Sequence, residues 1–178
     1  MSESIERHTF AVIVDNEPGV LARVIGLFAG RGYNIDSLTV AEVRHTDATS
    51  RITLVTTGTR MIIEQIKAQL RRLVPVQAVR DLTDEGPFVA KELALVKVAN
   101  TETKRRESLR IADIFDATVA DTTLGSFVFV ITGSPDKIDS FIELMDALGR
   151  IEVVRSGVVA IARGEAVLEA AAVTEGES

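Results

Sequence analysis

The sequence predicts an α+β fold made of two consecutive βαββαβ units. Two observations predict it. Apolar strand-like runs and helix-period apolar patterns follow one another in this order twice, and a polar segment ending in Gly-Pro, Asp81–Pro87, separates the two series. The chain has 178 residues, enough for two small domains; 46% are hydrophobic but only 4% aromatic. The core is therefore expected to consist mainly of Val, Ile, Leu and Ala side chains.

The first half begins with the β-branched apolar run Thr9–Val14, which predicts a buried strand. Apolar pairs then recur at three- and four-residue spacing over Val20–Gly30, as in a helix with one apolar face. Asn16 is predicted to cap this helix, and Pro18 fits its first turn. The other predicted elements of this half are strands at Asn34–Val43, Ser50–Thr57 and Val76–Leu82, and a helix at Arg60–Leu73 that Pro75 ends.

The second half gives the same order with little residue-level similarity to the first. Ser134 is predicted to cap its second helix, and Gly149 to end it. The Ala- and Glu-rich stretch after Gly164 is predicted to be frayed or disordered. The predicted helices are Thr103–Phe115 and Pro135–Leu148, and the predicted strands are Leu93–Val98, Ala117–Asp121, Ser126–Thr132, Ile151–Arg155 and Val158–Ala162.

Two consecutive units of this order imply two tandem ferredoxin-like sandwiches, each an antiparallel sheet with helices on one face. We predict one domain at residues 8–82 and a second at 91–164, joined by a linker at 83–90, with tails at 1–7 and 165–178. Such a sheet leaves unpaired backbone groups along its outer strands. Pairing that edge with a second copy of the chain is a common remedy, so we expect a homodimer.

The composition argues against several classes of function. Twenty Lys and Arg against 26 Asp and Glu give a formal net charge of −6, which disfavours a nucleic-acid or anionic-membrane partner. The absence of cysteine excludes a disulfide scaffold, a thiolate zinc site and a thiol nucleophile. The first ten residues contain no apolar signal-peptide core, and no apolar run approaches the roughly 20 residues that cross a bilayer. We therefore expect a cytoplasmic protein.

Residues with catalytic potential are sparse, and we predict neither a catalytic nor a metal site. His8 begins the first strand and His45 lies in a polar loop; neither has a visible orienting partner, so both are expected to be exposed and non-catalytic. Gly30–Gly32 resembles the start of a dinucleotide motif but follows a helix, and Ile35 stands where the third glycine belongs. The basic run Lys104–Arg106 is read as a solvated helix face, or alternatively as a docking patch for an acidic protein.

One loop has the features of a binding site. It joins a buried strand to a helix, and the free N–H groups at a helix start favour a carboxylate. Gly19 lets a ligand approach the backbone, the Asn16 amide can both accept from an ammonium and donate to a carboxylate, and Pro18 stiffens the loop. The alternative interpretation is a well-capped helix start with no ligand. The candidate residues are Asn16, Glu17, Pro18, Gly19, Val20 and Leu21.

Longer motifs add a family resemblance. The run DNEPGVLARVIGLFAGRGYNIDSLTVAEV resembles the ACT domain of the small regulatory subunit of acetolactate synthase (acetohydroxyacid synthase). The likeness continues through SRITLVTTG and ELALVKV to VVRSGVVAIARG, and so covers about residues 8–164. The Asn-x-Pro-Gly turn marks only the broad ACT class, whereas GLFAGRGYNIDSLTV and RSGVVAIARG are more specific to this family.

The resemblance implies a subunit with no catalysis and no cofactor of its own. Its partner would be the catalytic large subunit, which carries thiamine diphosphate, Mg and FAD. The small subunit would activate that partner and confer feedback inhibition by a branched-chain amino acid, most often valine. The family binds this effector between two ACT domains of a dimer, which assigns Asn34 and Ile35 to the partner's side of the ligand. Ala41 matches a family position where substitution relieves inhibition.

Two other functions stay open at the level of sequence. One is an ACT-type amino-acid sensor that serves another enzyme or a transcription regulator. The other is a small ferredoxin-like enzyme that uses His8, since folds of this class also host catalysts.

Overall fold

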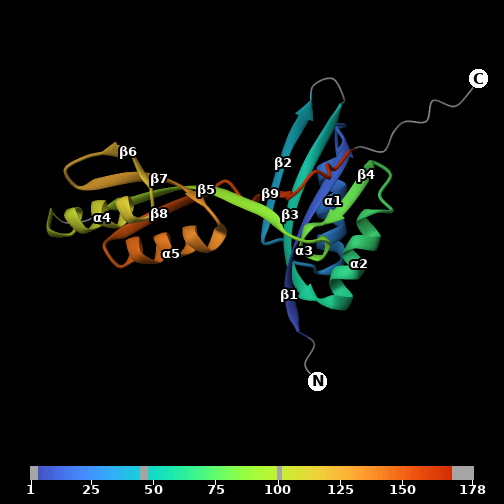
Figure 1. Cartoon of the computed structure of the whole chain (residues 1–178), viewed down its shortest axis with the longest axis horizontal. Coiled ribbons are helices and arrows are strands. Elements are labelled where there is room, and N and C mark those ends of the chain that lie inside the picture. Colours follow the sequence, from blue (N-terminus) through green and yellow to red (C-terminus); the bar gives the residue numbers. More distant parts are fainter. Residues whose placement is uncertain (1–3, 45–47, 100–101, 170–178) are drawn as a thin grey trace, which may run out of the picture. The chain divides into compact units, whose positions relative to one another are not determined.

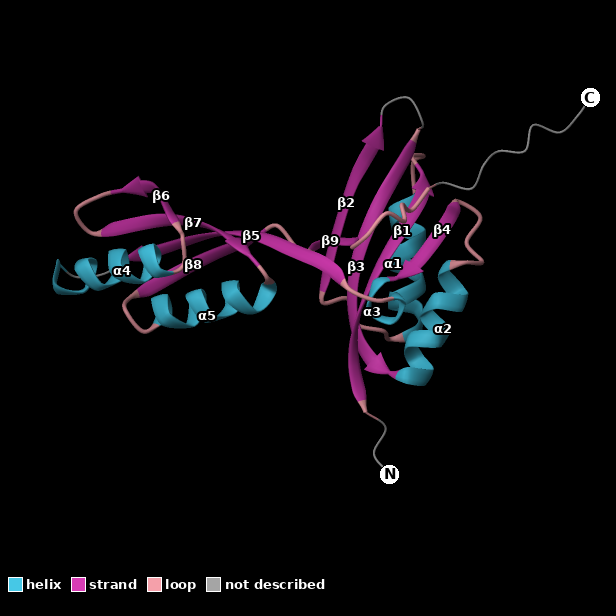
Figure 2. Ribbon diagram, in the orientation of Figure 1, coloured by secondary structure: helices cyan, strands magenta, loops and turns pink. Residues whose placement is uncertain are grey.

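A computed structural model describes residues 4–44, 48–99 and 102–169 (Figure 1). His45 and the last nine positions of the predicted tail lie outside the described residues. The chain forms two compact units, one comprising residues up to 89 together with those from 160 onward, and the other comprising residues 90–159. Both contain an antiparallel sheet with helices, so the predicted α+β class with two βαββαβ series is confirmed (Figure 2).

The first unit has a four-stranded sheet in the order β2-β3-β1-β4, so β2 and β4 are its edges. The helices α1 and α2 pack on one face of it (Figure 1). The elements are β1 (Ile5–Asp15), α1 (Val20–Arg31), β2 (Ser37–Arg44), β3 (Thr49–Thr59), α2 (Arg60–Leu70), β4 (Val76–Asp81) and α3 (Leu82–Glu85). The core between sheet and helices comprises Phe10, Val12, Val14, Val20, Val24, Phe28, Ile52, Leu54, Ile63, Ile66 and Leu70.

The second unit repeats this plan with the sheet order β6-β7-β5-β8. Its elements are β5 (Phe88–Ala99), α4 (Glu102–Ile114), β6 (Thr118–Thr122), β7 (Ser126–Gly133), α5 (Pro135–Asp146) and β8 (Arg150–Arg155). The last strand, β9 (Val159–Ala162), pairs with β5, but from Ala160 onward its residues group with the first unit. Ser134 caps α5 as predicted, because its side chain accepts a hydrogen bond from the Lys137 N–H. The core comprises Ala94, Val96, Val98, Ile111, Ala112, Phe127, Phe129, Ile131, Ile138, Phe141 and Met145.

Several predicted boundaries differ from the structure for local reasons. The polar segment after Asp81 contains the short helix α3 rather than an open linker, because the Asp81 carboxylate accepts from the N–H groups of Thr83 and Asp84. Residues from Ala160 group with the first unit rather than the second. They are fixed there by hydrogen bonds from Arg163 N to the Pro87 carbonyl (3.0 Å) and from the Arg51 guanidinium to the Ala160 carbonyl (2.9 Å).

The motif Arg155-Ser156-Gly157 closes the second unit's sheet. Arg155 donates two hydrogen bonds to the buried carboxylate of Glu92, at 2.8 and 2.7 Å, and a third to Asp139 at 2.6 Å. Ser156 exchanges two bonds with the backbone of Leu93, and Gly157 has a φ of 84°, where a side chain would be strained. Each of the three residues therefore helps to determine the conformation of this motif: Arg155 and Ser156 through hydrogen bonds, and Gly157 through its positive φ.

Candidate functional site

The helix start at Gly19 is built differently from its sequence-based prediction. The α1 helix begins at Val20, and Gly19 is its N-cap in a left-handed conformation with a φ of 87°. No side chain caps the helix, so the prediction that Asn16 does so is wrong, and Pro18 lies before the helix rather than in its first turn. A capping side chain belongs to the N-cap residue itself, and that position is taken by Gly19, three residues after Asn16.

This geometry leaves a backbone surface suited to an anion. Asn16, Glu17, Pro18 and Gly19 are exposed, whereas Val20 is buried and anchors the helix in the core. A Cβ at Gly19 would meet no atom within 4 Å, so the space beside its backbone is open. The first turn of α1 has no side-chain cap, although the Val20 N–H donates to the Glu17 carbonyl at 3.4 Å, and this turn carries the helix's partial positive charge beside the open space.

Apolar surface borders the same helix start. Leu21 is 38% exposed, and Ile25, one turn further along α1, is 40% exposed. Ile25 was not among the residues singled out from the sequence. Its signal was its four-residue spacing from Leu21, which places both side chains on one helix face.

Asn34 and Ile35 lie at the end of the sheet opposite the Gly19 loop within one chain. Asn34 and Ile35 precede β2 rather than belonging to it. The first residue of β2 pairs with Val55, which also pairs with Thr9, six residues before the end of β1. Six residues of strand span about 20 Å, so one chain does not bring Asn34 to its own Gly19 loop.

Asn34 is held in a defined position. Its amide donates to Asp36, and its carbonyl accepts from the Thr56 hydroxyl at 2.6 Å. Ile35 is half-buried and packs against the core. Ala41 is exposed on the edge strand β2, directly opposite Arg51 of β3.

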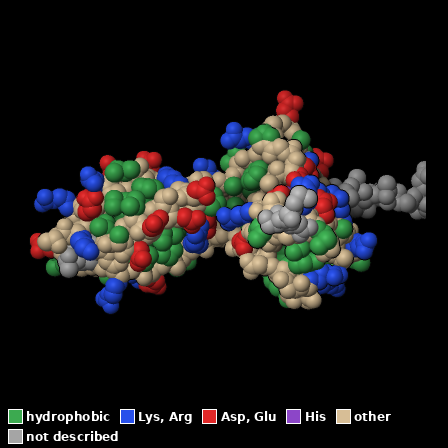
Figure 3. All heavy atoms as spheres, turned by 90° about the horizontal axis from the view of Figure 1, so that it is seen from below, with side chains coloured by type: hydrophobic (Ala, Val, Ile, Leu, Met, Phe, Trp, Pro, Cys, Tyr) green, Lys and Arg blue, Asp and Glu red, His purple; other side chains and the backbone are tan. Residues whose placement is uncertain are grey.

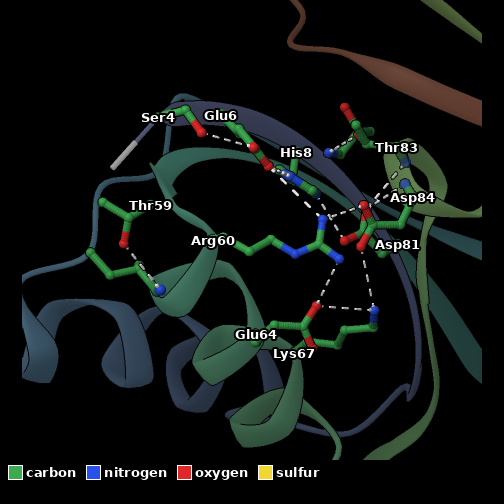
Figure 4. A network of polar contacts seen from close by, with 12 residues as sticks. Ser4, Glu6, His8, Thr59, Arg60, Glu64, Lys67, Asp81, Thr83 and Asp84 are labelled. Atoms are coloured by element: carbon green, nitrogen blue, oxygen red, sulfur yellow. Dashed lines mark hydrogen bonds and ion pairs between the residues drawn. The ribbon is translucent and has the colours of Figure 1, made fainter. Parts of the chain in front are cut away.

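His8 is buried, contrary to the sequence-based prediction. It is 1% exposed, its Nδ1 lies 2.9 Å from the Asp81 carboxylate, and its Nε2 lies 3.2 Å from that of Glu6 (Figure 4). Asp81 is the orienting partner that the sequence did not reveal, because 73 residues separate it from His8. Both ring nitrogens are thus engaged with carboxylates.

Charged groups surround this pair. Arg60 lies 2.9 Å from Asp84 and 3.9 Å from Glu6, and Lys67 lies 3.8 Å from Asp84 (Figure 4). Ligand atoms of His8, Asp81 and Asp84 lie within 4.8 Å of one another, as in some metal sites. Since Arg60 already neutralises Asp84 and the histidine bridges two carboxylates, we interpret the group as a structural ion network.

This network predicts a loss of stability in acid. The pKa of Asp84 is lowered, because partial burial, which raises it, is outweighed by the hydrogen bond and charge of Arg60; the hydrogen bond from His8 lowers the pKa of Glu6. Carboxyls with a lowered folded-state pKa stabilise the fold above their ordinary pKa, and this contribution disappears as the pH falls through the folded value. We expect the melting temperature to fall between about pH 5 and pH 3, and to fall less in Arg60→Met. An equal fall in Arg60→Met and in the control Arg72→Met would contradict this.

The described surface has no concentrated positive patch in the view of Figure 3, where basic and acidic side chains are interspersed.

The basic run Lys104–Arg106 has a partly structural role. Arg105 stacks over the Phe127 ring, 4.0 Å from its centre, and donates to the Thr122 hydroxyl.

None of the described helices combines the length and the apolar character needed to span a bilayer.

Comparison with known proteins identifies the family. Residues 91–164 match the family described as "Small subunit of acetolactate synthase", and residues 10–78 match the "AHAS small subunit-like ACT domain". A probable acetolactate synthase small subunit of Archaeoglobus fulgidus is 42% identical over 158 residues, which are 89% of this chain and 98% of that protein. The chain belongs to the acetolactate synthase small-subunit family.

Two further relatives agree with this assignment. The small subunit of acetolactate synthase isozyme 3 from Salmonella typhimurium is 42% identical over 91% of this chain and 99% of its own. The crystal structure of the small subunit from Thermotoga maritima superposes with a TM-score of 0.78 at 33% identity, covering 90% of this chain and 99% of that one. The resemblance inferred from the motifs is therefore confirmed.

Proposed function

We propose that this chain is the regulatory subunit of acetolactate synthase and that it activates the catalytic large subunit. It would also make that enzyme sensitive to inhibition by a branched-chain amino acid, with valine as the leading candidate. The observation that carries the proposal is the uncapped helix start at the left-handed Gly19, in a chain of the small-subunit family. The chemistry would take place in the large subunit, where thiamine diphosphate, Mg and FAD are expected; this chain would supply no cofactor.

The edge strand β2 supports a dimeric site. Val40 and Val43 on this strand are 42% and 51% exposed, which is unusual for an unpaired strand that avoids association. Antiparallel pairing of two β2 edges would bring the beginning of one β2 beside the end of the other. The Gly19 loop lies at the end of the sheet where β2 finishes, since Asp15 and Arg44 both pair with Thr49. Such a dimer would therefore bring the partner's Asn34 and Ile35 toward the loop.

The chemistry of the combined site fits an aliphatic amino acid. The α1 N–H groups and the Gly19 backbone would hold the carboxylate, and the amide oxygens of Asn16 and the partner's Asn34 would accept from the ammonium. Leu21, with the partner's Ile35, would contact the side chain. Binding would bias how the dimer meets the catalytic subunit, and a coupling free energy of about 1–3 kcal/mol is enough for strong inhibition.

The function is tested by reconstitution. Purified catalytic subunit should gain activity when this chain is added, and the gain should be reversed by valine in a saturable manner. The chain alone should form no acetolactate. Leucine, isoleucine and serine titrated in parallel would rank the effectors. If the chain binds an amino acid but leaves the catalytic subunit unaffected, it is a sensor for another enzyme; if it turns over substrate unaided, the regulatory assignment is wrong.

A further inference from the structure

A cavity lies in the first unit, on the face of the sheet opposite α1 and α2. Arg51 of β3 marks this face, because it alternates with Ile52, which points into the helix-covered core. The chain returning from residue 160 crosses this face and closes a cavity of about 340 Å³. The cavity size falls within the range of small-molecule sites.

Two guanidinium groups and an apolar wall line this cavity. The side chains of Arg51 and Arg80 contribute the charge, and Leu82, Ile161, Val167 and Leu168 contribute the apolar surface. A smaller adjoining hollow of about 140 Å³ shares Arg80 and Leu82 and adds Arg163.

The positive charge of the cavity is incompletely neutralised. Arg80 is paired, since its Nε lies 2.8 Å from the Glu85 carboxylate. Arg51 donates to the neutral carbonyl of Ala160, and among the described residues no carboxylate forms an ion pair with it. Burial lowers the pKa of Arg51, and the like charge of Arg80 lowers it further. The two arginines therefore repel each other in the absence of an anion.

We infer that this cavity binds a small aliphatic carboxylate that carries no amino group. A guanidinium binds a carboxylate through two parallel hydrogen bonds, and the apolar wall would cover a short branched hydrocarbon. An ammonium group would be repelled by the arginines, and Glu85, the acid that lines the adjoining hollow, is already paired with Arg80. The cavity thus differs in ligand chemistry from the zwitterion site proposed at Gly19, and it does not depend on that proposal.

Isothermal titration of the full chain with isovalerate tests the inference directly. Saturable binding at one site per chain is expected, weakening as salt is raised. Arg51→Gln should weaken binding about tenfold or more, and Arg51→Lys by less, because a charged donor is retained. The control Arg72→Gln removes one positive charge from an exposed position just after α2, and it should leave binding unchanged.

Substitution of Arg51 also removes its hydrogen bond to the Ala160 carbonyl, which alone could weaken binding. A second variant that keeps this hydrogen bond is therefore needed. Ala166 is exposed and lines the cavity, so Ala166→Trp should fill the space and abolish binding without touching either arginine. Inorganic phosphate should bind about tenfold more weakly than isovalerate, since it gains nothing from the apolar wall. The inference fails if isovalerate shows no saturable binding, if phosphate binds equally well, or if binding persists in both Arg51→Gln and Ala166→Trp. Loss of isovalerate binding in Gly19→Asp alone would assign it to the other site.

Discussion

Replacing Gly19 with aspartate is expected to abolish valine inhibition of the reconstituted enzyme while leaving its activation intact. The new carboxylate would occupy the open space beside the α1 N–H groups and repel the carboxylate of the amino acid. Aspartate also accepts a φ of 87° poorly, so the loop itself would shift. We expect valine affinity to fall about a hundredfold or more, measured by calorimetry and by the inhibition curve.

Two matched variants separate the causes of this loss. Gly26→Asp introduces the same charge on the same helix, at an exposed position with open space, and should leave valine inhibition unchanged. Gly19→Asn adds similar bulk and similar backbone strain but no charge, and should give an intermediate affinity. Full valine sensitivity in Gly19→Asp would show that the effector binds elsewhere.

Replacing Arg155 with methionine is expected to destabilise the second unit by about 3 kcal/mol. The Glu92 side chain is 3% exposed, and it would lose the hydrogen bonds that satisfy its charge. The pKa of Arg155 is raised chiefly by its hydrogen bonds to Glu92, which indicates that the charged pair is strongly preferred. The Arg155 side chain is 36% exposed, so we expect the lower end of the range for a broken buried pair. Urea unfolding measures the change.

The accompanying variants identify the unpaired charge as the cause. Adding Glu92→Gln to Arg155→Met should recover much of the lost stability, because no buried carboxylate then remains ionised. Lys97→Met breaks an ion pair of similar length to Glu152, but both of its members are exposed, and the melting temperature should stay unchanged. If the double variant were as unstable as Arg155→Met, lost packing rather than buried charge would be responsible.

The sequence predicted those features that depend on neighbouring residues. The period of apolar residues revealed α1, and Ser134 was correctly identified as the cap of α5, because both signals are contained within a few positions. The prediction of Asn16 as a cap failed for a conformational reason. Nothing in the composition of the turn distinguishes a side-chain cap from a left-handed glycine cap.

Features that depend on distant residues could not be predicted. The burial of His8 requires Asp81 from β4, and the cavity at Arg51 requires the chain beyond Ala160 to return across the first sheet. For the candidate site, the motifs predicted the residues, and the family resemblance assigned Asn34 and Ile35 to the partner chain, whereas their positions on the sheet required the structure. The strand register puts Asn34 and the Gly19 loop at opposite ends of one sheet, so the proposed site requires two chains.

Complementation between two inactive variants tests this two-chain site most directly. Gly19→Asp and Asn34→Ala homodimers should each bind no valine. After the two are unfolded and refolded together, about half of the dimers are mixed, and each mixed dimer has one site with both halves intact. Calorimetry of the mixture should therefore find valine bound with wild-type affinity at about one quarter of the wild-type number of sites. If the mixture binds no valine, the effector is not held between two protomers.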